Sequence, residues 1–414
     1  EALAELASAN PDAPPAHVPA FLTHRRAGPP TLDEEFSLAT QAILRGRNAL
    51  DRLNTILLSE ARSHWPQLWF TLAPRPIIMT SWVGYDTDGR TDIGWWDTLR
   101  LRLRMKQLQL SRLHDQIEPV TSCANDLQQR VRTALDAVAD QIAACPTDAD
   151  PEAVSRFADV LINRSAEALT SSNDLSAAFG EAIDAATPED KMTLAVARAG
   201  FMAHGLAAAH THTRLNATQL HNIARQRLNI TDNPDIPAQR RALISRMNEA
   251  LDGVTPIEID FGSLLMEQAS AGRLMMTVRQ ILRHIDRTSP IRFLIAETET
   301  GYTLLTALWL ARLYGVDDMI EISPLFETQE ALENGEQIIE EALRSPHWRA
   351  YLHRTRKLSL QFGFSDSGRY VGQLAATYLI ERLRIKVCDL LRKWDLAFVE
   401  VILFDTHGES IGRG

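Results

Sequence analysis

Apolar residues recur every three or four positions over several long stretches of the chain, which is the period of a helix with one buried face. The first stretch runs from Asp33 to about Trp65. Residues 187–190 (Thr-Pro-Glu-Asp) predict a helix start, because Thr suits the cap position and Pro suits the first turn. We expect further helices over 124–180, as two segments separated by a turn at 145–148, and from about Pro237 to Gly253.

Residues 95–119 give two conflicting signals. Leucine and methionine alternate with arginine at first, which is the period of a strand. The composition, however, consists largely of good helix formers, so we predict a helix. Arg102 and Arg104 of this helix are then expected to be solvated surface charges.

Short apolar runs of strand character lie between the helical stretches. They are residues 75–82, 205–212, 291–297, 318–327, 358–366 and 396–407. Each run is followed by a helical pattern, and this alternation predicts a parallel sheet. The first run is not followed by the glycine fingerprint of a dinucleotide-binding sheet. We therefore predict a helix-rich (β/α)₈ TIM-type barrel, incomplete in this chain because only six strands are recognised.

Polar residues that could take part in chemistry stand at the ends of these runs. They are Asp86, Asp88, His210, His212, Arg214, Glu297, Glu299, Glu327, Asp366, Asp405 and His407, with Arg413 shortly after them. A (β/α)₈ barrel brings the carboxyl ends of its strands around one mouth. The sequence therefore predicts an active site at that mouth.

Composition narrows the class of protein. The 414 residues are 45% hydrophobic with a formal net charge of −10, which disfavours nucleic acid as the main partner. No apolar run approaches the roughly 18–20 residues of a membrane helix, so no membrane association is expected. Three cysteines without metal or redox spacing favour a cytoplasmic location. The chain opens on Glu1 and ends in a glycine-rich loop, so we expect a fragment of a longer protein.

The expected organisation has two parts. Residues 1–70 form an N-terminal loop and helix, and residues 71–414 form the partial barrel, with a helical insertion at about 95–200.

Glu327 and Asp366 are the candidate metal ligands. Each is a single acid at the end of an apolar run, and Mg²⁺ or Mn²⁺ prefers carboxylate oxygens. The alternative is that Glu327 caps the following helix and Asp366 makes a turn. Residues 86–89 (Asp-Thr-Asp-Gly) lack the later ligands of a calcium loop, and the spacing of His204, His210 and His212 matches no standard zinc site.

Arg413 is the candidate anion-binding residue. It lies among glycines that allow close approach of the backbone to a phosphate or carboxylate, which the guanidinium can bind through two hydrogen bonds. The alternative is a flexible surface loop.

Three motifs in this order resemble the phosphoenolpyruvate carboxylase family. They are PLFET around Glu327, FSDSG around Asp366, and the terminal GESIGRG. SWVGYDTDG (81–89) and THTRLNAT (211–218) are similar to two further segments of that family, so the resemblance covers roughly residues 70–414.

The resemblance implies that phosphoenolpyruvate and bicarbonate give oxaloacetate and phosphate through carboxyphosphate and an enolate, as part of carbon dioxide fixation. Glu327 and Asp366 would bind Mg²⁺ or Mn²⁺. Arg214, Arg369 and Arg413 would be catalytic. Asp86, Asp88, Asp405, His407 and Gly412, together with Arg413, would contact substrate. The family is generally tetrameric, so a homotetramer is expected.

The chain departs from the family pattern at several of these positions. Thr87 replaces an Arg, Arg369 a Lys and Tyr370 an Asp, while Asp405 and His407 stand where the family has His and Arg. The family's catalytic His has no counterpart, and we expect it upstream of Glu1. Two alternatives to an active carboxylase therefore stay open. One is a catalytically altered or non-catalytic metabolite-binding relative. The other is a different metal-dependent lyase acting on an enolpyruvate or 2-oxo acid.

Overall fold

The computed structural model describes residues 30–85, 93–234 and 236–405, without the side chains of 364–366 and 405. Six strands form one parallel sheet in the order β1-β2-β3-β4-β5-β6. The strands are β1 Thr80–Ser81, β2 His210–Asn216, β3 Ile291–Ala296, β4 Ile320–Phe326, β5 Lys357–Phe362 and β6 Glu400–Asp405. The predicted helix-rich α/β fold with a parallel sheet is confirmed.

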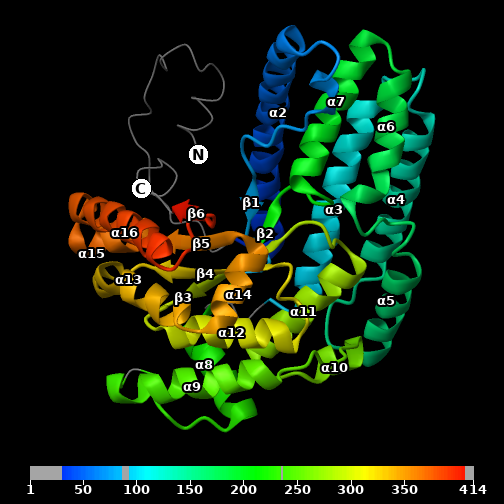
Figure 1. Cartoon of the computed structure of the whole chain (residues 1–414). Coiled ribbons are helices and arrows are strands. Elements are labelled where there is room, and N and C mark those ends of the chain that lie inside the picture. The colour runs from blue at the N-terminus through cyan, green and yellow to red at the C-terminus, as the bar shows by residue number, and fades with distance from the viewer. Residues whose placement is uncertain (1–29, 86–92, 235, 406–414) are drawn as a thin grey trace, which may run out of the picture.

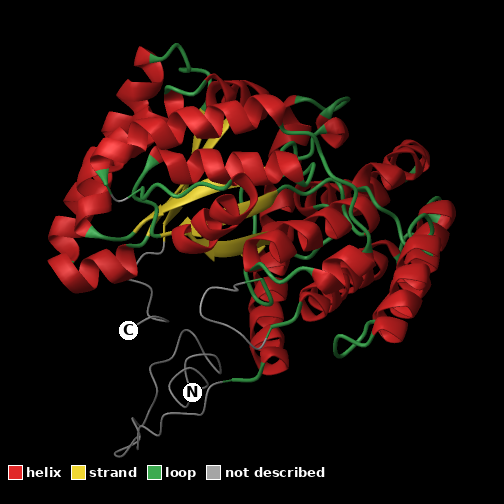
Figure 2. Cartoon of the chain, turned by 90° about the horizontal axis from the view of Figure 1, so that it is seen from below, coloured by secondary structure: helices red, strands yellow, loops and turns green. Residues whose placement is uncertain are grey.

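Helices connect the strands and pack around them (Figure 2). Before β2 lie α2 Leu32–His64, α3 Trp95–Ile117, α4 Asn125–Ala143, α5 Pro151–Asn163, α6 Ser176–Ala185 and α7 Pro188–His204, with short 3-10 turns Trp69–Thr71 and Ser172–Leu175. After β2 come α8 Ala217–Leu228, α9 Pro237–Gly253, α10 Phe261–Met266 and α11 Ser270–His284. The later helices are α12 Gly301–Leu313, α13 Gln329–Leu343, α14 Pro346–Thr355, α15 Phe364–Val371 and α16 Gln373–Lys393.

The sheet is curled. The ring of His212 on β2 lies 4.7 Å from the ring of Phe404 on β6, measured between centroids. Following paired residues across the sheet from His212 leads instead to Glu400, four positions before Phe404. The ring contact thus joins residues that are four positions out of register across the four steps from β2 to β6. This offset is about one residue per strand, the value that a closed barrel of eight parallel strands would have. Complete (β/α)₈ closure stays a prediction.

Helices α2 to α7 stand together as a tall group beside the sheet (Figure 1). Helices α3, α4, α6 and α7 share an apolar core that includes Leu113, Val131, Phe179 and Phe201. A larger core surrounds the strands. None of the helices in the described part of the chain has the length and hydrophobicity needed to cross a lipid bilayer.

The predicted helices at 33–65, 95–119, 187 onward and 237–253 are confirmed. The second segment within 124–180 is interrupted: α5 ends at Asn163, and a 3-10 turn precedes α6. The cause is local, because the Asp174 carboxylate accepts hydrogen bonds from the backbone N–H groups of Thr170 and Ser171. Such side-chain bonds give the backbone an alternative to the helix.

Two predicted strands differ from the structure. In the run 75–82 only Thr80–Ser81 is a strand, because Pro76 lacks an N–H donor and the side chain of Ile77 is largely exposed. The run 205–212 was placed too early, and the strand is His210–Asn216. Gly205 ends α7 with a φ of +65°, and the alanines that follow form a buried connection in which the Ala208 N–H donates to the Met105 carbonyl.

The sequence also predicted Arg102 as a surface charge, and this prediction is wrong. It is 1% exposed and pairs with Asp286, with 2.6 Å between Nη2 and Oδ2. The same carboxylate group accepts hydrogen bonds from the N–H of Leu206 and from the N–H and hydroxyl of Thr288. One turn along α3, Lys106 donates to the carbonyls of Leu169 and Ile285. These contacts fasten α3 to the connection that leads into β3. Arg104, by contrast, is partly exposed and pairs with Asp33.

Replacing Asp286 should destabilise the protein strongly. Asp286→Ala leaves Arg102 buried without its carboxylate, which costs about 3–5 kcal/mol of unfolding free energy. The measurement is chemical denaturation beside Asp389→Ala, which removes an exposed pair with Arg392 and should change stability by less than about 1 kcal/mol. Equal effects of the two substitutions would contradict the role assigned to Asp286.

Lys106 should make stability depend on pH. Burial lowers the pKa of Lys106 to about 7 in the folded protein from 10.5. Between these values the unfolded chain binds the extra proton, so stability should rise with pH from 7 to 10. Denaturation at pH 7 and pH 9.5 should show a smaller rise for Lys106→Met than for the wild type. Identical rises in the two proteins would show that Lys106 does not titrate in this way.

Candidate active site

The carboxyl ends of β4 and β5 meet closely. The N–H of Gly363, directly after β5, donates to the Phe326 carbonyl at the end of β4, at 2.9 Å. A Cβ atom on Gly363 would lie 2.5 Å from the Cβ of Glu327, a distance that is too short for two carbon atoms that are not bonded. Glycine is therefore needed at 363 to let the two strand ends come together. Glu327 itself is partly buried at this junction.

The sequence predicted Asp366 at the end of a strand, but in the structure its backbone lies in a helix. Strand β5 stops at Phe362 and α15 begins at Phe364. The backbone of Asp366 belongs to the first turn of α15, three positions after Gly363. The Ser367 hydroxyl donates to the Gly363 carbonyl at 3.0 Å and holds this turn onto the end of β5. The segment that carries Asp366 thus starts beside Glu327, while the Asp366 side chain lies outside the described part of the structure.

Arg214 lies inside β2 and not after it, because the strand is shifted relative to the sequence prediction. It is paired in register with Leu294 of β3. Its N–H faces the Tyr85 carbonyl at 3.4 Å, just before residues 86–92. It alternates with Thr213, so its side chain points to the same face of the sheet as that of His212.

His204 and His210 are structural. The Met79 N–H donates to Nε2 of His204 at 3.0 Å, and Nε2 of His210 bonds the Ala203 carbonyl at 3.1 Å. Burial lowers the pKa of His204 to about 3 and that of His210 to about 2, so both rings are neutral. Among the described residues no three His, Cys, Asp or Glu side chains gather into one group that could hold a metal ion.

Other predicted site residues are exposed or undescribed. Arg369 is exposed one turn after Asp366, and the side chain of Tyr370 beside it is 77% exposed. Asp86, Thr87, Asp88, His407, Gly412 and Arg413 lie outside the described residues, and so does the side chain of Asp405.

A polar cavity of about 340 Å³ lies at the ends of β2, β3 and β4. His221 and Arg225 of α8 line it together with Glu297 and Thr328. Nε2 of His221 bonds the Thr303 hydroxyl at 3.0 Å. The sequence indicated the acidic residues here by their place after an apolar run. The sequence analysis missed His221 and Arg225, because it placed β2 too early and so did not place α8 directly after the strand.

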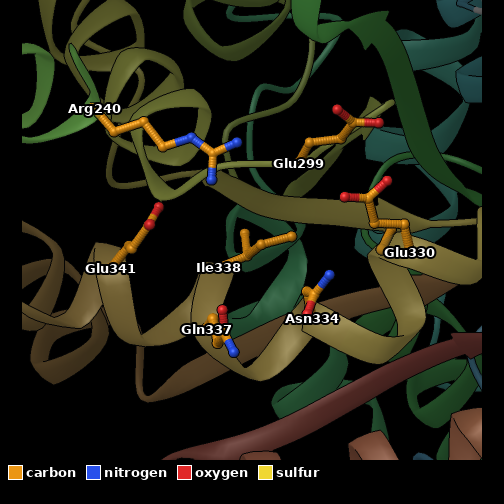
Figure 3. Close-up of a pocket in the computed structure, with 8 residues that line it drawn as sticks. Arg240, Glu299, Glu330, Asn334, Gln337, Ile338 and Glu341 are labelled. Atoms are coloured by element: carbon orange, nitrogen blue, oxygen red, sulfur yellow. The ribbon is translucent and has the colours of Figure 1, made fainter. Parts of the chain in front are cut away.

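A smaller cavity of about 120 Å³ adjoins it through Glu299. Figure 3 shows Arg240 and Glu341 at one end of this cavity and Glu299 and Glu330 at the other. One Glu341 oxygen accepts the Gly301 N–H at 3.0 Å, at the start of α12. The two cavities at the carboxyl edge of the sheet are therefore lined by both signs of charge.

Part of the chain is similar in sequence to known proteins. The family model for phosphoenolpyruvate carboxylase matches residues 238–414, which include Glu327, Asp366 and Arg413. A phosphoenolpyruvate carboxylase of Gloeobacter violaceus is 26% identical over 223 residues, covering 52% of this chain and 23% of that protein. Those of Marinomonas sp. and Pseudomonas aeruginosa are 30% and 32% identical over 122 and 111 residues, covering 30% and 27% of this chain.

The matched segments span only a small part of these relatives, between 12% and 23% of each. Over residues 238–414 this chain is therefore similar to the phosphoenolpyruvate carboxylase family, at low identity to its individual members.

Proposed function

We propose that this chain carries the metal-binding part of a site that carboxylates phosphoenolpyruvate with bicarbonate, giving oxaloacetate and phosphate. The family match supports this reaction class. The observation that carries the proposal is the contact of Gly363 with Glu327, because it brings together the two segments that bear the acids.

The donor set fits a hard divalent cation. Glu327, directly after β4, and Asp366, in the first turn of α15 after β5, would supply carboxylate oxygens. Mg²⁺ or Mn²⁺ binds such oxygens while keeping positions open for substrate. When bound, the ion would polarise the oxygen on which charge develops as phosphate leaves phosphoenolpyruvate.

Cationic side chains of the chain itself would hold the anions. Arg214 on β2 and Arg369 on α15 stand on elements that reach the same edge of the sheet, and Arg413 follows β6. In this proposal they neutralise the phosphate of the substrate and the carboxyphosphate formed from bicarbonate. Fixed positive groups in a partly dry site lower the barrier to such phosphoryl transfer. Asp86, Asp88, Asp405, His407 and Gly412 would complete the substrate contacts.

A metabolite-binding relative without turnover is the second candidate. It is favoured by Tyr370, a largely exposed aromatic residue at a position where the resemblance expects an Asp. In that case the protein would bind metal and phosphoenolpyruvate but release no oxaloacetate. The assembly into a homotetramer is likewise a proposal, which the molar mass in solution would test.

Loss of the Glu327 carboxylate should abolish turnover. Glu327→Gln keeps the size of the side chain but removes the charge, so oxaloacetate formation with Mg²⁺ should fall by more than about 100-fold. Oxaloacetate is measured through its reduction by malate dehydrogenase. The control variant is Glu333→Gln, on the exposed face of α13. If the wild type binds Mn²⁺ and phosphoenolpyruvate without turnover, the second candidate holds. If Glu327→Gln retains full Mn²⁺ affinity, the metal role is wrong.

Gly363→Ala should weaken metal binding without altering any charged group. The added methyl would overlap the Glu327 side chain and push the two strand ends apart, so Mn²⁺ affinity should fall about 10- to 100-fold. Electron paramagnetic resonance of free Mn²⁺ gives the affinity. Gly180→Ala in α6 is the matched control, because its Cβ would have no atom within 4 Å. Equal Mn²⁺ affinity in both variants would contradict the positioning role of Gly363.

A further inference from the structure

A third cavity, of about 430 Å³, lies on the concave side of the curled sheet. Every strand contributes to its wall, with Thr80 from β1 and Ile402 from β6 closing the two sides. Among the described residues Glu327 does not line it. The cavity is therefore separate from the edge at which the metal site is proposed.

Buried polar atoms without a partner face this cavity. Among the residues that the structure describes, neither ring nitrogen of His212 has a hydrogen-bond partner, and neither has the hydroxyl of Ser323 or of Ser359. These three side chains come from β2, β4 and β5 and are 0%, 2% and 5% exposed. Buried polar groups in folded proteins are nearly always hydrogen-bonded. Three of them converging on one cavity indicate a polar occupant.

The charges around the cavity favour an anion. Arg292 and Lys357 line it, and both pair with the single carboxylate of Glu321, each at 3.3 Å. Glu321 is buried and can neutralise only one of the two cations. Glu400 also lines the cavity. It is exposed to solvent and the Lys357 side chain is 40% exposed, so solvent screens both of these charges. Arg292 and Lys357 are the two cationic donors that the lining offers to an anion.

The protonation state of His212 also depends on these surroundings. Burial, and to a smaller extent the charge of Arg292, lower the pKa of His212 to about 3. The ring is therefore neutral, with one nitrogen able to donate and the other able to accept. The two serine hydroxyls can turn their protons toward an acceptor placed between them.

We propose that this cavity binds a small oxyanion, held by the Lys357 ammonium and the hydroxyl groups of Ser323 and Ser359. His212 donates its ring N–H to the same group. Charge-assisted bonds of this kind are the strong hydrogen bonds of proteins, and they satisfy each of the atoms left unpartnered. Phosphate and carboxylate share this chemistry. The site does not depend on the reaction proposed above, because it uses neither Glu327 nor Asp366.

The serines separate a binding role from a structural one. Ser359→Ala removes a buried hydroxyl that has no partner among the described residues, so the anion-free protein should unfold at the same or a higher temperature. Calorimetric titration should nevertheless show phosphate or acetate binding at least ten-fold more weakly than in the wild type. The titrations use the whole chain at constant ionic strength, with chloride as the balancing ion.

A second variant tests the charge. Lys357→Gln should weaken binding at least ten-fold, whereas Lys393→Gln, which removes an exposed Lys paired with Glu340, should leave it unchanged. In protein labelled with ¹⁵N-histidine, the ring signals of His212, assigned through His212→Gln, should move as the anion is added.

Each result decides the proposal. Binding of phosphate alone would support a tetrahedral oxyanion, and binding of acetate alone would support a carboxylate. The proposal is overturned if neither anion binds the wild type with saturation. It is equally overturned if binding leaves the His212 signals in place or survives both Ser359→Ala and Lys357→Gln.

Discussion

Parallel pairing of the strands in chain order is the constraint on which the rest of this structure depends. A parallel neighbour can be reached only by a connection that returns to the amino end of the sheet, so every strand from β2 onward is preceded by at least one helix. All carboxyl ends consequently lie at the same edge. That edge collects Glu327, the start of α15 and the acidic residues after β3.

Two buried carboxylates show how differently charge is balanced on the two sides of the molecule. Asp286 is fully occupied: Arg102, Leu206 and Thr288 all donate to it, and the result is a rigid junction between α3 and β3. Glu321 is shared by two cations, Arg292 and Lys357, each at 3.3 Å. A saturated carboxylate stabilises the fold, whereas a shared one leaves its cations able to bind another anion.

Much of the fold was predictable, for a physical reason. Strands β3, β4 and β5 are buried on both faces and therefore appear as short runs rich in apolar residues. The long helices carry regular apolar periods and clear caps, such as Thr187 before α7. Arg102 could not be predicted in the same way, because its burial depends on Asp286, 184 positions away in the sequence. The place of Asp366 in a helix likewise follows from the early end of β5.

Strand β2 was predicted too early in the sequence, over 205–212, because of what it faces. Its residues are mostly polar yet mostly buried, so they lack the apolar signature by which the other strands were found. A polar strand inside a curled sheet costs stability unless its groups are satisfied. Thr213 reaches a backbone carbonyl only at the limit of hydrogen-bond distance, and His212 reaches no partner among the described residues. Apolar residues at these positions would stabilise the fold better. The presence of His212 and of the two serines opposite it is therefore better explained by a ligand in the interior than by the packing of the sheet.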